Sequence, residues 1–433
     1  MHDTQSDKRS VMRDSNFLWL LSGSAISMLG DQFTVLALPW LVLQATGSAF
    51  ATGMIVATIG LPRAVFILIG GALVDRYTPK RVLMLTKYVN GVLLALLAAM
   101  VLTNHIVLPL IFALAVAIGL ASAFSIPSGT AMLVHVLPLQ KLQTGNSMLM
   151  GARQIALLGG PLLAGLLISV AGNDAAMPVA DSRGLGLAFG LNCLSFVISA
   201  WTLAKVRTLN VPKPPHRPPV LGAVRTGLAA VWHDREMRTC FGYWAVVMLC
   251  LGGSMQVALP VLANTRLHGA GALGLLTGAH GAGSLIGMGA IALVGQRRAG
   301  TLGCTLLLVD AVAGALLIPL GWIGAAWQGV LLLLLLGALA GFTQVAVSSW
   351  LQKRVQPALL GRVMSIFMFI LLGLAPLSAL VTGWLMQYVG LAQLFAASGC
   401  VLIGLAILTF LFTPMRHVVD TPPASPIQPA SSQ

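Results

Sequence analysis

Charged residues are scarce in this chain. Its 433 residues include only 11 acidic side chains and 25 lysines and arginines, so that 8% of the sequence is charged and 57% is hydrophobic. A soluble domain carries about a quarter charged residues. With a mean hydropathy of +0.91, the chain could not cover its surface in water, which excludes a soluble enzyme or binding protein.

Several motif classes are also missing. The chain contains no Gly-x-x-x-x-Gly-Lys-Ser/Thr sequence, which disfavours an ATP-driven pump. It has no cluster of acids and histidines that would suit an enzyme active site or a metal centre. The first apolar run lacks the short core and small-residue cleavage site of a secretory signal, so we expect it to be retained. No Cys-x-x-Cys pair occurs, so neither a zinc site nor a disulfide framework is predicted for Cys193, Cys240, Cys250, Cys304 and Cys400.

What the sequence does contain is twelve long apolar runs. Each is long enough to cross a bilayer, and in lipid each must be a helix because its backbone groups have no water to bind. The sequence therefore predicts an all-α membrane protein with transmembrane helices at about 17–44, 49–73, 82–102, 107–127, 146–171, 185–205, 240–263, 271–294, 302–320, 327–349, 363–389 and 390–412.

The basic residues predict the orientation of these helices. Twenty of them lie in segments that share one side if the N-terminus is cytoplasmic, and only Arg183 and Arg266 lie on the other side. This asymmetry follows the positive-inside rule. It places both termini in the cytoplasm and explains the net charge of +14 without a nucleic-acid partner.

The break between the sixth and seventh runs divides the chain. We expect a cytoplasmic N-terminal tail at 1–16, a six-helix bundle at 17–205, a cytoplasmic linker at 206–239, a second six-helix bundle at 240–412 and a disordered cytoplasmic tail at 413–433. The linker begins with a stiff proline-rich stretch and continues into a predicted amphipathic helix at 221–238. That helix fits the membrane surface and a solvated linker equally well.

The two halves also repeat short sequences at matching positions. Ala72-Leu-Val74 recurs as Ala292-Leu-Val294, and Val136-Leu-Pro138 recurs as Val355-Gln-Pro357. The similar spacing of the two pairs indicates a parallel repeat of six helices.

A glycine-rich, charged motif lies between the second and third runs. Gly71, Asp75, Arg76, Lys80 and Arg81 match, in type and spacing, the loop signature Gly-x-x-x-Asp-Arg-x-Gly-x-Arg/Lys-Arg/Lys of the major facilitator superfamily. The chain resembles that family over residues 17–412, although Thr78 replaces the usual glycine. The resemblance implies that this loop serves conformational switching, with Asp75 approaching the start of the eleventh helix near Arg362 when the inner gate is shut.

Other motifs narrow the resemblance. Gly160-Pro161 and Gly165, in the fifth run, look like the Gly-Pro motif of the family's exporters, where proline and glycine allow a helix to pivot; generic small-residue packing explains them equally well. Gly30-Asp31, Thr46-Gly47-Ser48, Leu61-Pro62 and the stretch from Pro357 to Val363 are similar to the branch of macrolide-efflux proteins and enterobactin exporters.

The resemblance implies an architecture and a function. We expect two pseudo-symmetric six-helix bundles around a central cavity lined by the first, fourth, seventh and tenth helices, in the inner membrane of a bacterium. The leading hypothesis is a monomeric secondary transporter, without a cofactor, that exports a small amphiphilic compound by proton antiport. An importer or facilitator of a small nutrient is the alternative, and a membrane-embedded enzyme or a channel is a remote one.

Ionisable residues inside the apolar runs are candidate functional groups because they are costly in lipid. Asp31 and Arg63 lie roughly 21 and 18 Å from the cytoplasmic face at 1.5 Å per residue, on consecutive helices. They could form a structural ion pair, or Asp31 could be the carboxylate that couples transport to protons. Lys87 lies near the end of its run.

The remaining polar residues have less defined roles. His280 could be a packing residue or a proton carrier, and Arg153 could bind an anionic group or pair with a cytoplasmic carboxylate. Asp310 lies in the ninth run, outside the expected cavity, so a structural role is predicted. Uncharged candidates for lining the cavity are Gln32, Trp40, Gln256 and Gln344.

Overall fold

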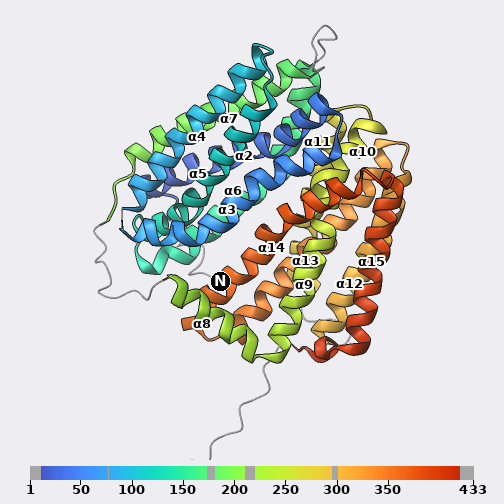
Figure 1. Cartoon of the computed structure of the whole chain (residues 1–433). Helices are drawn as coiled ribbons and strands as arrows, with labels where there is room; N and C mark the ends of the chain where they lie inside the picture. Colours follow the sequence, from blue (N-terminus) through green and yellow to red (C-terminus); the bar gives the residue numbers. More distant parts are fainter. Residues whose placement is uncertain (1–10, 77, 173–180, 210–219, 295–300, 420–433) are drawn as a thin grey trace, which may run out of the picture.

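The computed structural model describes residues 11–76, 78–172, 181–209, 220–294 and 301–419. In these ranges the regular secondary structure is entirely helical (Figure 1). The N-terminal half contains α2 (Ser15–Thr46), α3 (Ala49–Arg76), α4 (Pro79–Leu102), α5 (Leu108–Val134), η1 (Leu139–Lys141), α6 (Leu142–Ala171) and α7 (Ser182–Lys205). The remainder contains α8 (Val220–His233), α9 (Arg235–Gly253), η2 (Ser254–Ala258), α10 (Leu259–Thr265), α11 (Ala270–Val294), α12 (Leu302–Leu317), η3 (Ile318–Trp322), α13 (Ala326–Arg354), α14 (Pro357–Leu385), α15 (Leu391–Phe412) and η4 (Pro414–His417).

Each of the twelve predicted segments coincides with a helix or a run of consecutive helices. Within the described residues, eleven helices are long and apolar enough to cross a membrane. The prediction of an all-helical membrane protein is therefore confirmed. The eighth predicted span corresponds to α11, a 25-residue helix that is not among the eleven, and its membrane crossing stays a prediction.

Local sequence signals set the helix ends. Gly47 ends α2 in a left-handed conformation, with φ 63°, and its N–H donates to the carbonyl oxygen of Leu43. Pro357 is the first residue of α14, where a missing N–H costs nothing. Thr78 precedes α4 with φ −70°, so the position where the family motif has glycine needs no left-handed residue here.

The two halves meet along two pairs of helices. In Figure 1 the N-terminal half, blue to green, lies against the C-terminal half, which runs to red, and α3 runs beside α14 while α6 runs beside α11. Both contacts use glycine. A Cβ atom on Gly165 of α6 would lie 2.6 Å from the Cα of Gly274 of α11, and one on Gly53 of α3 would clash with the carbonyl oxygen of Ala379 of α14. Small residues allow such close crossing of membrane helices.

These contacts lie toward one end of the molecule. Gly165, Gly271 and Gly383 make close contacts across the two halves near the ends of α6, α11 and α14 that we predict to face outward. Gln44 of α2 also donates a 2.9 Å hydrogen bond to Asn264 of α10 at that end. The halves are therefore joined at the predicted outer side.

The linker helix is shorter than predicted. The expected helix at 221–238 ends at His233, because Asp234 caps the start of α9 by accepting hydrogen bonds from the N–H groups of Glu236 and Met237. α8 packs mainly against α14, with Gly227 facing Arg362. Leu228 and Trp232 are exposed, a pattern that suits a membrane surface.

The predicted disorder of the tail is wrong at its beginning. Residues 413–419 fold back on α12: the N–H of Gly303 donates to the carbonyl oxygen of Val418, and Thr301 donates to that of Arg416. Met415 and Val418 are fully buried. A pattern of proline and serine predicts disorder only where no apolar side chain can be buried, and these two residues are exceptions. Residues 420–433 lie outside the described residues.

An ion-pair cluster joins two helix ends in the C-terminal half. Arg354, at the end of α13, donates to Asp234 at 2.6 and 3.0 Å and to Glu236 at 2.7 Å. Burial opposes ionisation of Asp234, but the hydrogen bonds from Arg354 and from the backbone of Met237 outweigh it, so the pKa of Asp234 lies below its ordinary value. The charged form of Asp234 is thus the stable one.

The first prediction concerns the contact between the halves. Gly165→Val should place two methyl groups against Gly274, cost about 1–3 kcal/mol of stability as overpacking, and lower the thermal unfolding midpoint in detergent. Gly159→Val is the matched control on the same helix, because a Cβ there would meet nothing within 4 Å. An equal loss of stability in both variants would contradict the assigned contact.

The second prediction concerns the Asp234 cluster. A carboxyl whose pKa is lowered by folding stabilises the protein above its unfolded pKa of about 3.9, and this contribution is lost as the pH falls through the folded value. Asp234→Asn keeps a good helix cap but loses the charge that pairs with Arg354. It should reduce stability by about 1–3 kcal/mol at pH 7 and by less near pH 3, as measured by thermal unfolding.

Asp14→Asn is the control for that experiment. Asp14 caps α2 through the N–H groups of Asn16 and Phe17, and within the described residues it has no arginine partner. A pH-independent loss at Asp234 of the same size as at Asp14 would show that the cluster is only a helix cap.

Candidate functional site

Four charged side chains gather in the N-terminal half. Asp31 of α2 interacts electrostatically with Lys87 of α4 and Arg63 of α3, and Arg63 also interacts with Arg153 of α6. Asp31 also accepts a hydrogen bond from Asn192 of α7. The structure therefore brings three of the predicted coupling residues, Asp31, Arg63 and Arg153, into one charged group.

Asp31 is accessible although it lies in the middle of α2. Its side chain is exposed, as is that of Val35 one turn later, which is 62% exposed. Arg153 is also exposed and Arg63 is partly buried. α3 and α6 are the helices that meet the other half, so the charges of Arg63 and Arg153 stand on the elements that a rocking movement would displace.

A direct ion pair between Asp31 and Arg63 is not formed. Within the part of the chain that the structure describes, the ion pairs closer than 4 Å that involve these candidate residues are none, and those found join Arg354 to Asp234 and Glu236. The two groups interact through space instead. Of the two alternatives for this pair, the geometry favours an accessible carboxylate over a structural salt bridge.

Lys87 is a stronger electrostatic neighbour of Asp31 than Arg63 is. It is only 6% exposed, donates a 3.0 Å hydrogen bond to Ser27 and lies 5.3 Å from the centre of the Phe196 ring. The sequence analysis placed Lys87 near a helix end because the apolar run begins at 82, whereas α4 begins at Pro79. The Thr78-Pro79 start signal would have shown that Lys87 lies two turns inside the helix.

Trp40 does not line an accessible cavity, so that prediction is wrong. Its side chain is fully buried, and its Nε1–H donates a 2.9 Å hydrogen bond to Asp181, just before α7. Burial raises the pKa of Asp181, and the hydrogen bond from Trp40 partly offsets this. Trp40 thus ties α2 to the start of α7.

The Gly-Pro motif lies at a crossing of helices. A Cβ on Gly160 would clash with the side chain of Gln32, so α6 approaches α2 closely there. One turn further, the carbonyl oxygen of Pro161 and the Cα of Gly165 face Gly274 of α11. The motif therefore touches both a helix of its own half and one of the other half, which is where a pivot would act.

The switch motif is described only in part. Gly71, Asp75 and Arg76 continue the helix α3, and their side chains lie outside the described residues. Lys80 donates hydrogen bonds to the carbonyl oxygens of Ala204 and Val206, at 3.2 and 2.7 Å, and so caps the end of α7. Arg81 is exposed.

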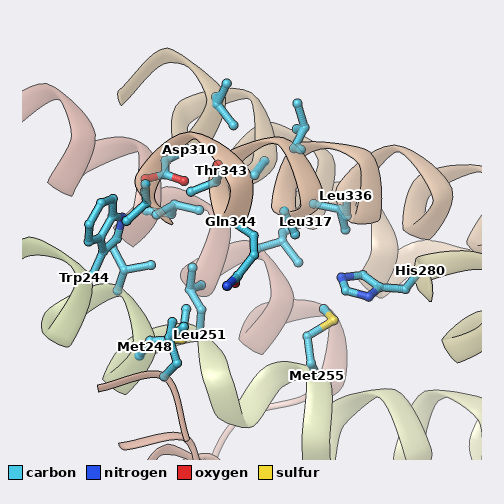
Figure 2. A pocket seen from close by; sticks show the side chains of 18 of the residues that line it. Trp244, Met248, Leu251, Met255, His280, Asp310, Leu317, Leu336, Thr343 and Gln344 are labelled. Atoms are coloured by element: carbon cyan, nitrogen blue, oxygen red, sulfur yellow. The ribbon is translucent and has the colours of Figure 1, made fainter. Parts of the chain in front are cut away.

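A cavity of about 230 Å³ lies inside the C-terminal half (Figure 2). His280 of α11 and Gln344 of α13 line it, as predicted for Gln344. Gln256 is partly buried in the π-helical segment η2 and is not among the lining residues. In Figure 2 His280 and Met255 lie at one end of the cavity, and Asp310 and Trp244 at the other.

Asp310 also lines this cavity, which the sequence analysis did not expect. The hydroxyl of Tyr243, on α9, donates a 2.8 Å hydrogen bond to it. The expectation came from the place of the ninth helix in the family, whereas the side chain reaches inward past that position. Within the described residues, no group of three or more His, Cys, Asp and Glu side chains could hold a metal ion.

Comparison with known families decides the identity of the fold. The family profile described as Major Facilitator Superfamily matches residues 20–377. The chain belongs to the major facilitator superfamily. It is a transporter and a multi-pass protein of the bacterial inner membrane, which takes small-molecule substrates.

Its curated relatives are exporters. The chain is 26% identical to the multidrug efflux pump Tap of Mycobacterium tuberculosis, over 97% of this chain and 100% of the pump. It is 25% identical to the enterobactin exporter EntS of Salmonella typhimurium, over 92% of this chain and 93% of the exporter. Both agree with the branch suggested by the sequence motifs.

Solved structures share the fold. The nucleoside transporter NupG aligns with a TM-score of 0.70 at 13% identity, over 92% of this chain and 98% of that chain. The peptide transporter PepTSo aligns with a TM-score of 0.71 at 12% identity, over 93% and 98%. At these identities the likeness establishes the architecture alone.

Proposed function

We propose that this major facilitator superfamily member is a secondary active transporter that exports a small amphiphilic compound, such as a drug, a macrolide-like compound or a siderophore, by proton antiport. The observation that carries the proposal is Asp31, an accessible carboxylate in the middle of α2 with Lys87 and Arg63 as electrostatic neighbours. A carboxylate at this depth is costly in lipid and is retained for function by default.

The direction of transport rests on the relatives. A multidrug efflux pump and an enterobactin exporter match this chain over nearly its whole length. The alternative, import or facilitated entry of a small nutrient, has support only from nucleoside and peptide transporters that share the fold at 12–13% identity. Export is therefore the better supported direction.

The movement we propose is a rocking of the two halves about their glycine contacts. The α6–α11 and α3–α14 crossings are joined at the predicted outer side, which corresponds to a protein open toward the cytoplasm. Rocking about these crossings would close the cytoplasmic side and open the outer side. The positive-inside count supports cytoplasmic termini and a cytoplasmic linker.

Asp31 can couple protons to this movement because its electrostatic neighbours stand on different helices. A change in the distance from Asp31 to Arg63 or Lys87 changes the free energy of ionising the carboxyl. Asp31 would take up a proton when open to the outer side and release it when open to the cytoplasm. We propose that the protein works as a monomer, with the proton gradient as its energy source and no cofactor.

The third prediction tests this coupling. In inverted membrane vesicles, where the outer side faces the lumen, an imposed pH gradient should drive ethidium accumulation by the wild type. Asp31→Asn should reduce this pH-driven accumulation roughly tenfold or more, because the side chain no longer carries a proton, while exchange of ethidium without a gradient persists. Asp31→Glu should keep part of the activity with a shifted pH dependence.

The opposite result would relocate the coupling site. If Asp31→Asn still concentrates ethidium with the wild-type pH dependence, Asp31 does not couple transport, and His280 becomes the residue to test. If neither variant nor wild type responds to the pH gradient in either direction, proton antiport is wrong for this protein.

A further inference from the structure

The cavity in the C-terminal half is a recess with an accessible mouth and a buried floor. Ala340 and Gln344, one turn apart on α13, are exposed and line its mouth. The floor is closed by side chains that are less than 5% exposed, namely Trp244, Leu317, Val347, Phe367 and Leu402. At about 230 Å³ the recess is smaller than the roughly 300–1,000 Å³ of a whole drug-sized site, so it fits one end of a larger molecule.

Two polar groups in its wall have no partner. Trp244, 4% exposed, has no hydrogen-bond acceptor for Nε1–H, and Thr343 has no partner for its hydroxyl, within the protein as described. More than 90% of buried polar groups in proteins are hydrogen-bonded, and an exception calls for an explanation. Because both residues line the recess, a ligand oxygen would satisfy them.

A carboxylate lies at the same end. Asp310 accepts its hydrogen bond from Tyr243, and within the described residues no arginine or lysine pairs with it. Figure 2 shows Asp310, Thr343 and Trp244 together at one end of the recess. A carboxylate facing an apolar cavity is stabilised when a cation pairs with it. The charge of this end therefore favours a cationic ligand over an anionic one.

The rest of the wall suits an aromatic ligand. Trp244 and Phe367 pack edge to face, with ring centres 5.8 Å apart. Aromatic faces attract organic cations by about 0.5–2 kcal/mol. Met248 and Met255, partly buried on the near side of the recess, are flexible side chains that adapt to ligands of different shape.

We propose that this recess, formed within the C-terminal half alone, is a binding subsite for the aromatic end of an apolar organic cation, with Asp310 pairing with the charge and Trp244 and Thr343 donating to ligand oxygens. The proposal rests on the proposed function, since it gives the class of compound that is exported. It places this part of the substrate away from Asp31, so that substrate and proton have separate sites.

The fourth prediction uses two probes of nearly equal shape. Methyltriphenylphosphonium carries a positive charge, and triphenylphosphine oxide is neutral and presents an oxygen in place of the methyl group. Both are measured by equilibrium dialysis against the full-length protein in detergent, with no pH gradient. Asp310→Asn should weaken binding of the phosphonium roughly tenfold, which corresponds to about 1.4 kcal/mol, and leave binding of the oxide nearly unchanged.

Two tryptophan variants test the donor. Trp244→Phe keeps the ring and removes Nε1–H, so it should weaken binding of the oxide severalfold. Trp350→Phe is the matched control, because Trp350 is 1% exposed and also has an unpartnered Nε1 but does not line the recess. Tyr243→Phe leaves the Asp310 carboxylate in place and should retain binding of the phosphonium, even if Asp310→Asn disturbs folding.

Several results would overturn the subsite. These are equal phosphonium binding by wild type and Asp310→Asn, equal losses of oxide binding in Trp244→Phe and Trp350→Phe, and loss of phosphonium binding in Tyr243→Phe as large as in Asp310→Asn, which would indicate a structural pair. The binding measurement needs no proton gradient. A failure of antiport in the vesicle experiment therefore leaves this result independent, and the reverse also holds.

Discussion

The close approach of two pairs of helices is the constraint on which the rest of this structure depends. At the α6–α11 and α3–α14 crossings, glycine allows one backbone to touch another, and any larger residue would separate the two halves. Between membrane helices the hydrophobic effect supplies no net attraction, so association relies on this close packing. The same smooth surfaces let one half rotate on the other without breaking hydrogen bonds. Stability and movement thus come from one set of residues.

Polar residues are then restricted to the places where this arrangement leaves them partners or solvent. Asp31 is accessible and has two cations near it, Lys87 is satisfied by Ser27 and Phe196, and Asp310 is held by Tyr243. The acidic groups stand in different halves, and in the account given above they do different work. Asp31 carries the proton on the side that moves relative to α3 and α6, whereas Asp310 faces a recess built within one half.

The sequence predicted the fold closely and the site only partly. Spans and the family followed from apolar runs and the loop motif, because lipid leaves a chain few alternatives to helices. Positions along a helix predicted which residues are at comparable depth, such as Asp31 and Arg63. They did not predict rotation about the helix axis, and for that reason Trp40 was placed in a cavity although it is buried against Asp181. Lys87 and Asp310 were misjudged because their partners lie far away in sequence, on α2 and α9.

Distances between spin labels test the rocking movement most directly. One pair, at Leu139 and Lys353, reports the predicted cytoplasmic side, and another, at Val107 and Tyr388, reports the outer side; all four positions are exposed and each pair spans both halves. In a cysteine-free background, lowering the pH should shift the two distance distributions in opposite senses, and Asp31→Asn should remove the pH dependence. Distances that change in the same sense, or a pH response that persists in Asp31→Asn, would contradict coupled alternating access.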